Sequence, residues 1–305
     1  AAAGLATAPT RRKNAALLGM AASFRANVQL LKQENARDLA AAREMGLSEA
    51  MIDRLALDDK RIESMAASVE RVATLDDPVG EILDMAVRPN GLQIGRMRVP
   101  IGVIGIIFES RPNVTADAGC LCLKSGNAVI LRGGKEAIHS NLAIARLMDE
   151  AIQQAGLPAG SVQLVPTTDR AAVHELLQRD DLIDLIIPRG GRSLIEMVVA
   201  NSRIPVIKHY DGNCFVYLDA AADPLTAMSI TLNAKTQRPG VCNAAESLLM
   251  HEDFARRHGA DVIAKLREAG VEVRADDALR RLVPDLPAAT DEDWETEYLD
   301  LIITA

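Results

Sequence analysis

Short apolar segments alternate with helical segments from residue 100 onward, and this alternation limits the possible folds more than any other feature of the chain. Strands that alternate with helices in this way form a parallel sheet covered on both faces. Because such sheets bind ligands at the carboxyl ends of their strands, the loops after Phe108, Leu131 and Ile187 are of interest. The strands are expected at 101–108, 128–131, 162–165, 182–187 and from 206, with helices at 115–124, 139–155, 171–178 and 192–200.

A second α/β unit is expected after residue 213. Single cores stop growing at about 250–300 residues, so a chain of 305 residues favours two domains. We expect a cofactor-binding domain with a helical amino-terminal region at 1–213 and a catalytic domain at 214–305. The catalytic domain is predicted to contain strands at 215–218, 247–250 and 271–273 and helices at 224–233 and 254–268. A last strand from Leu301 stops abruptly, so we expect this domain to be incomplete.

The region before the alternation is different in character. Residues 11–75 are rich in Ala, Leu, Arg, Glu and Met, with apolar positions at helical spacing, which indicates helices that cover a sheet or a partner. Residues 81–99 alternate between apolar and polar around Pro89-Asn90-Gly91, which predicts a β-hairpin.

Composition excludes several classes of protein. The net charge is −8 and no long run of Lys and Arg occurs, which argues against a nucleic-acid partner. No apolar run is long enough to span a bilayer, and the first residues do not read as a signal peptide. The four cysteines have neither a disulfide framework nor zinc spacing, and the five histidines form no metal set. We therefore expect a cytoplasmic protein with reduced thiols and no metal.

Two glycine-containing turns follow predicted strands and are candidates for anion binding. After Ile187, the turn containing Arg189, Gly190 and Gly191 opens a helix, and free amides at a helix start can bind a pyrophosphate. A glycine pair alone is more often an ordinary turn than a phosphate site, although its place between strand and helix favours binding.

The turn after Leu131 contains Arg132, Gly133 and Lys135. It lacks the spacing of a phosphate-binding Walker loop. Its two cations lie at the sheet edge and are suited to a ribose phosphate, or they are solvated surface charges.

Cys242 differs in its surroundings from the other cysteines. It follows Lys235 and Arg238 in a segment that cannot readily continue a helix. Nearby cations lower the pKa of a thiol and increase its thiolate fraction. Cys120 and Cys122 lie in an apolar helix and Cys214 beside a strand, where a cysteine is usually an inert core residue. Cys242 is therefore the candidate nucleophile.

Several long motifs resemble the γ-glutamyl phosphate reductase family of the aldehyde dehydrogenase superfamily. The most specific is Phe108-Glu109-Ser110-Arg111-Pro112-Asn113-Val114-Thr115. The other matching segments are 46–55, 99–105, 123–136, 187–191, 233–239 and 242–243. The resemblance extends over nearly the whole chain.

The resemblance implies an aldehyde dehydrogenase-like α/β fold, with a parallel Rossmann-type cofactor domain, an α/β catalytic domain and an oligomerisation hairpin, for which residues 81–99 are the candidate. It implies reduction of L-glutamate 5-phosphate by NADPH to glutamate 5-semialdehyde, phosphate and NADP, the second step of proline synthesis. It also implies a homo-oligomer, with the upstream glutamate kinase as a further partner.

The resemblance also implies roles for particular residues. Cys242 would attack the acyl carbon and expel phosphate, leaving a thioester. The Cys242 amide and the Asn113 side chain would donate to the oxyanion. Lys235, Arg238 and Arg111 would bind the phosphate or carboxylate of the substrate.

Two departures from the wider superfamily refine this interpretation. Oxidising aldehyde dehydrogenases carry a Glu in a Glu-Leu-Gly-Gly motif that activates water. The corresponding residues 207–212 include no Glu, which agrees with a thioester that must be protected from water. In the turn after the second strand, Lys135 replaces the acid found in the superfamily, and a cation there suits the 2′-phosphate of NADP.

Three other functions remain open from the sequence. The chain could be another acylating dehydrogenase, acting on a different acyl phosphate or thioester. It could be a non-catalytic dinucleotide-binding protein with an inert Cys242. It could also be a structural protein that oligomerises through its helical first third.

Overall fold

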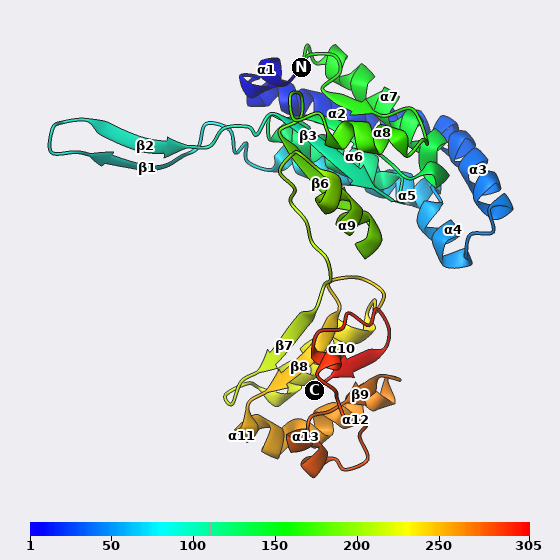
Figure 1. Cartoon of the computed structure of the whole chain (residues 1–305), viewed down its shortest axis with the longest axis vertical. Helices are drawn as coiled ribbons and strands as arrows, with labels where there is room; N and C mark the ends of the chain where they lie inside the picture. The colour runs from blue at the N-terminus through cyan, green and yellow to red at the C-terminus, as the bar shows by residue number, and fades with distance from the viewer. Residues whose placement is uncertain (110) are drawn as a thin grey trace. The chain divides into compact units, whose positions relative to one another are not determined.

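A computed structural model describes residues 1–109 and 111–305 of the chain. These residues form two compact units, Ala1–Lys208 and His209–Ala305. Each unit contains its own parallel sheet, as Figure 1 shows, and each is described by itself below.

The first unit begins with a layer of helices. They are α1 (Ala2–Ala6), α2 (Thr10–Ala26), α3 (Val28–Glu44), α4 (Glu49–Leu55) and α5 (Asp59–Thr74). Ser48 and Asp58 cap α4 and α5, accepting hydrogen bonds from the amides of Met51 and Arg61 at 3.4 and 2.7 Å. These helices confirm the interpretation of residues 11–75.

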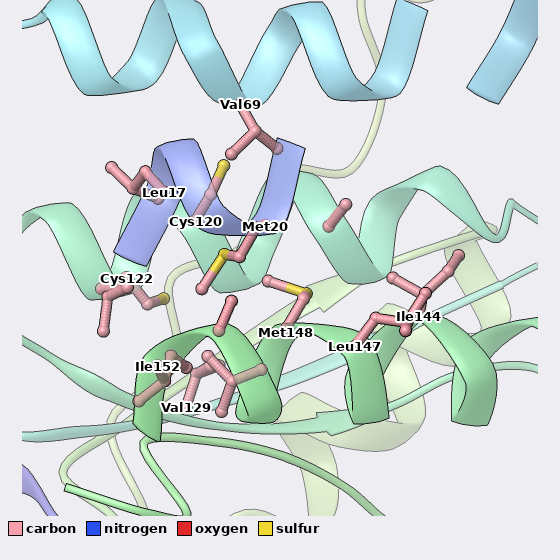
Figure 2. Packing of buried hydrophobic residues seen from close by; sticks show 14 of the residues in the cluster. Leu17, Met20, Val69, Cys120, Cys122, Val129, Ile144, Leu147, Met148 and Ile152 are labelled. Carbon is pink, nitrogen blue, oxygen red and sulfur yellow. The ribbon is translucent and has the colours of Figure 1, made fainter. Parts of the chain in front are cut away.

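The core of the first unit lies where α2 and α5 pack against α6 (Asn113–Lys124) and α7 (Ile138–Gln154). Figure 2 shows Leu17 and Met20 of α2 in this cluster, together with Met148 of α7. Cys120 and Cys122 of α6 also lie here, and burial raises the pKa of each thiol to about 12. Neither thiol ionises near neutral pH, so both are core residues, as expected.

The sheet of the first unit has the strand order β5-β4-β3-β6, and every neighbouring pair is parallel. Its strands are β3 (Val103–Phe108), β4 (Ala128–Arg132), β5 (Val162–Leu164) and β6 (Leu185–Arg189). Besides α6 and α7, the connecting elements are η1 (Lys135–Ala137), α8 (Ala171–Leu177) and α9 (Arg192–Asn201). The predicted parallel sheet is thus confirmed.

Two strand limits differ from the prediction. The strand expected from 182 begins only at Leu185, because residues 179–183 close a turn in which the amides of Leu182 and Ile183 donate to the Arg179 carbonyl. The strand expected from 206 is a single bridge between Val206 and Ile186, after which the chain leaves the sheet.

Residues 81–99 contain the predicted hairpin, formed by β1 (Ile82–Val87) and β2 (Gln93–Met97) paired antiparallel. Gly91 in its turn has φ 83°, a conformation that favours glycine. All residues of both strands are exposed, including Val87 at 68% and Met97 at 60%. In Figure 1 the hairpin extends away from the helices of its unit.

The second unit has the strand order β7-β8-β10-β9, again parallel throughout. Its strands are β7 (Cys214–Leu218), β8 (Ala245–Met250), β9 (Glu272–Arg274) and β10 (Ile302–Thr304). Its helical elements are α10 (Pro224–Thr236), α11 (Glu252–Phe254), the π-helical turn η2 (Ala255–Gly259), α12 (Ala260–Glu268), α13 (Asp277–Leu282) and the short η3 (Glu292–Trp294). The strands predicted at 215–218, 247–250 and 271–273 are all present within a residue or two.

The prediction that a loop begins at Lys235 was wrong. The α10 helix begins at Pro224, capped by Asp223, and continues to Thr236 rather than ending near Asn233. Lys235 therefore lies on a helix, where its side chain is fully buried.

Asp293 ties the segment before β10 to the rest of the second unit. Its carboxylate accepts hydrogen bonds from the amide and hydroxyl of Thr290, from Arg274 at 2.7 Å and from the Tyr298 hydroxyl at 2.7 Å. The backbone hydrogen bond from Thr290, and then those from Arg274 and Tyr298, hold the pKa of Asp293 well below its usual range.

Asp293→Asn is expected to lower the free energy of unfolding at pH 7 by about 1–3 kcal/mol. A carboxyl with a lowered folded pKa stabilises the fold above its unfolded pKa of about 3.9, and that contribution is lost as the pH falls below it. Urea unfolding at pH 7 and pH 3 should therefore show a larger loss for the wild type than for the variant. Asp261→Asn, on the exposed face of α12, is the control. Equal losses in wild type and Asp293→Asn would contradict this role.

Candidate active site

The loops predicted to bind a cofactor lie at one edge of the first unit's sheet. Ile107 of β3 pairs with Arg132 at the end of β4, and Phe108 pairs with Arg189 at the end of β6. From β3 the chain adds β4 and β5 on one side and then crosses to add β6 on the other. Such a reversal creates the crevice in which open α/β sheets bind ligands.

The glycine turn after β6 presents its amide to an anion. Gly191 is the residue before α9, and its amide donates a hydrogen bond to a carboxylate oxygen of Glu109 at 3.0 Å. A Cβ on Gly190 would lie 2.6 Å from the same oxygen, so a larger residue there would displace the Glu109 side chain. Arg189 is exposed, and Arg192 is paired along its own helix with Glu196. The carboxylate of Glu109 thus already occupies the position in which an anionic ligand group would accept from Gly191.

The two cations of the turn after β4 differ in their surroundings: Arg132 is hydrogen-bonded and Lys135 is exposed. The guanidinium of Arg132 donates to the carbonyls of Gly133 at 2.9 Å and Thr168 at 3.1 Å, and burial lowers its pKa. A Cβ on Gly133 would overlap the buried amide of Asn141. Lys135 is exposed and makes no ion pair within residues 1–109 and 111–305. Arg132 therefore shapes the loop, and Lys135 is the cation it presents to solvent.

Asn113 and Arg111 lie in and just before the first turn of α6. The Asn113 side-chain amide donates to the Asp117 carboxylate at 2.9 Å, and burial raises the pKa of Asp117. The Arg111 amide donates to the Glu109 carbonyl at 2.8 Å, and its side chain is partly exposed. Both residues follow β3 and therefore lie at the same edge as the two glycine turns.

Cys242 lies on the second unit's loop between α10 and β8, and its side chain is partly exposed. Its carbonyl accepts a hydrogen bond from the thiol of Cys214 at 3.4 Å. Within the described part of the chain its amide donates no hydrogen bond. This loop therefore offers both an accessible thiol and an available backbone donor beside it.

Gly212 is the residue that makes room for Cys242. A Cβ on Gly212 would lie 2.9 Å from the Cys242 Cβ and would overlap the Cys242 carbonyl oxygen. The same atom would lie 2.8 Å from a carboxylate oxygen of Glu297. The absence of a side chain at this position allows the thiol residue and the glutamate to approach the same backbone.

Glu297 carries a buried carboxylate oxygen. Its Oε1 atom is enclosed, and no hydrogen bond reaches it from the residues that the structure describes. A buried acceptor left unsatisfied costs about 1–3 kcal/mol, so such an atom is suited to a hydroxyl or amide of a ligand. Glu297 is therefore a candidate ligand residue next to Cys242.

Lys235 does not contribute an available charge to this loop. Its ammonium bonds the Glu246 carboxylate at 2.7 Å, and both side chains are 0% exposed. Glu246 also accepts from the Leu299 amide at 3.4 Å. The pair joins α10, β8 and the segment before β10. Arg238, by contrast, is exposed and has no ion-pair partner among the described residues.

Sequence reasoning missed Gly212, Cys214, Glu246 and Glu297. Glu246 had the clearest signal, because a single acid within the apolar segment 244–250 requires a buried partner. Glu297 and Gly212 had no signal in the sequence, because only the fold brings residues 85 positions apart to the same thiol.

Comparison with known proteins shows the family of the chain. The sequence model of the aldehyde dehydrogenase family matches residues 2–284, which defines an enzyme class that uses a nicotinamide dinucleotide. The γ-glutamyl phosphate reductase of Geobacter metallireducens is 54% identical over 303 residues, covering 99% of this chain and 72% of that protein. The chain therefore belongs to the γ-glutamyl phosphate reductases of the aldehyde dehydrogenase family.

Solved structures show the same relationship. The crystal structure of γ-glutamyl phosphate reductase from Thermotoga maritima has a TM-score of 0.91 and 47% identity, covering 98% of this chain and 72% of that one. The Saccharomyces cerevisiae enzyme of the same name has a TM-score of 0.64 and 33% identity, covering 100% and 77%. The predicted aldehyde dehydrogenase-like fold is confirmed.

Lys235→Met is expected to lower the free energy of unfolding by about 3–5 kcal/mol, because it leaves the Glu246 carboxylate buried without a partner. The double variant Lys235→Met with Glu246→Leu removes both charges and should recover most of that loss. Chemical denaturation of the three proteins measures both effects. Additive losses in the double variant would show that the two groups do not depend on each other.

Gly212→Ala is expected to displace Cys242 and to reduce turnover about 100-fold, since small misplacements at a reacting group have effects of this size. Gly240→Ala in the same loop is the matched control, because a Cβ there would come no closer than 3.6 Å to another residue. Steady-state rates and dinucleotide binding should be measured for both. Loss of dinucleotide binding in Gly212→Ala, or equal rates for the two variants, would argue against local displacement of the thiol.

Proposed function

We propose that the chain catalyses the NADPH-dependent reduction of L-glutamate 5-phosphate to L-glutamate 5-semialdehyde and phosphate, through a thioester on Cys242, in proline biosynthesis. The observation that carries this proposal is the position of Cys242. It is a partly exposed thiol with an available backbone amide, packed against Gly212, in a chain 53–54% identical to γ-glutamyl phosphate reductases.

The first unit fits a nicotinamide dinucleotide. Its strand order places the glycine turn of Gly190 and Gly191 beside β3, where a pyrophosphate would replace Glu109 as the acceptor of the Gly191 amide. Arg189 adds positive charge there, and Lys135 would bind the 2′-phosphate of NADP. When bound, this cofactor supplies a hydride to the acyl carbon.

The thiolate of Cys242 performs the first chemical step. It attacks the acyl carbon of the substrate, a carbon–sulfur bond forms, and the bond to the phosphate oxygen breaks to release phosphate. The Cys242 amide and Asn113 would stabilise the oxyanion that develops. For Asn113 this requires its side-chain amide to turn from Asp117.

Reduction of the thioester gives a thiohemiacetal, which returns the thiolate of Cys242 when the carbon–sulfur bond breaks and the aldehyde leaves. Arg238 and Arg111 are the proposed partners of the substrate's phosphate or carboxylate. Lys235 was expected to share this role. We instead propose that it holds the loop through Glu246, because its buried ammonium already has a carboxylate partner.

We also propose that the β1–β2 hairpin mediates homo-oligomer formation. An exposed two-stranded ribbon is marginally stable alone. Its apolar side chains are exposed, for example Met85 at 56% and Ile94 at 45%. Pairing with a second copy would cover them. The interaction with glutamate kinase that the resemblance implies stays a prediction. No helix of the described residues is long and apolar enough to cross a membrane.

Cys242→Ala is expected to abolish phosphate-dependent reduction of NADP by glutamate semialdehyde, with a loss on the order of 10³-fold or more. Cys122→Ala is the control, since it removes a buried thiol whose pKa is raised to about 12 by burial. Iodoacetamide should label Cys242 before the other cysteines in the wild type. Equal rates for the wild type and Cys242→Ala would overturn the mechanism.

A further inference from the structure

Asp117 is a carboxylate without a cationic partner beside Asn113 in the first unit. It lies on α6 one turn after Asn113, so the two side chains occupy the same face of the helix. The Oδ2 atom of Asp117 accepts from the Asn113 side-chain amide at 2.9 Å, and Oδ1 accepts from no donor within residues 1–109 and 111–305. Asp117 forms no ion pair within these residues, and it is partly exposed, so a ligand can reach it.

The surroundings of Asp117 leave its charge poorly compensated. Burial raises the pKa of its carboxyl, and the hydrogen bond from Asn113 and the charge of Arg71 on α5 lower that pKa only in part. The guanidinium of Arg71 donates instead to the Ser68 hydroxyl at 2.7 Å. The single hydrogen-bond donor to the carboxylate is thus a neutral amide. A carboxylate that is partly removed from water is stabilised more by a cation than by such an amide.

The proposed substrate carries one cation, the ammonium on its α-carbon. Arg111 and Arg238 suit its anionic groups, and neither can accept a hydrogen bond from an ammonium. An ammonium that leaves water without an acceptor is costly, so the site needs an acceptor for it. The acyl carbon and the nitrogen of the substrate are separated by three carbons, about 5 Å when extended. The Cβ atoms of residues four apart on a helix are about 5–6 Å apart, so Asn113 and Asp117 match this separation.

We propose that Asp117 is a specificity-determining residue that binds the α-ammonium of the substrate and in doing so releases Asn113. The ammonium takes the place of the Asn113 amide on Oδ2, because two opposite charges attract more strongly than a charge and a neutral amide. The freed amide then turns to the oxyanion that Asn113 stabilises in the proposed mechanism. Recognition of the substrate and assembly of the oxyanion site are thus coupled through one carboxylate. This inference rests on the proposed function, because it assigns the amino-group specificity of that same site.

The test compares two aldehydes in the phosphate-dependent reduction of NADP. They are L-glutamate 5-semialdehyde and 5-oxopentanoate, which is the same molecule without the amino group. Asp117→Asn should lower kcat/KM for the semialdehyde about 10–100-fold, as expected for loss of one hydrogen bond between charged groups, and change that for 5-oxopentanoate less than about twofold. Asp117→Glu keeps the charge and should retain part of the preference. Glu150→Gln, a surface change on α7, is the control and should alter neither aldehyde.

A second variant, Asp117→Ala, tests the release of Asn113. It removes the acceptor that holds the Asn113 amide away from the oxyanion. Its kcat for 5-oxopentanoate should therefore equal or exceed that of the wild type, and a lower kcat would contradict the release step.

The remaining outcomes separate this inference from the function on which it rests. Equal losses with the two aldehydes in Asp117→Asn, or an unchanged preference, would overturn the role of Asp117 and leave the proposed function standing. A wild-type protein that uses the two aldehydes equally well would also overturn ammonium recognition. Absence of phosphate-dependent reduction with either aldehyde in the wild type would instead overturn the proposed function itself.

Discussion

All neighbouring strands in the first unit's sheet run in the same direction, and the placement of its candidate binding groups depends on this. Parallel strands put every carboxyl end at one edge, so loops far apart in the sequence begin side by side. Glu109, Lys135 and Gly191 come from three such loops. Because β3 lies at the point where the strand order reverses, the glycine turn after β6 faces the loop after β3.

The second unit positions its candidate nucleophile by a different means. Here a missing side chain and a buried ion pair determine where the thiol lies. Gly212 leaves space that Cys242 and Glu297 share, while Lys235 and Glu246 connect α10 to β8 on either side of the loop. Two buried charges are tolerated because each satisfies the other at 2.7 Å. The loop that carries Cys242 is thus anchored at both ends.

Much of this could be predicted from sequence patterns. The parallel sheet, the hairpin at 81–99 and the inert core cysteines all followed from local apolar periodicity and turn residues. The errors have local causes as well. The α10 helix continued past Asn233 because Lys235 found a buried partner, and the strand from 182 began late because residues 179–183 formed a turn. Neither the buried partner of Lys235 nor this turn can be predicted from the spacing of apolar residues.

The sequence by itself determined the type of fold and the family, because alternating strands and helices and long motifs are properties of neighbouring residues. It also made Cys242 the candidate nucleophile. Only the tertiary structure decided which charges remain available. Lys235, Lys135 and Arg132 are all cations beside predicted loops, yet one is buried against Glu246, one is exposed, and one is bonded to two carbonyls. The physical reason is that burial and hydrogen-bond partners depend on residues distant in the chain, which a linear pattern does not contain.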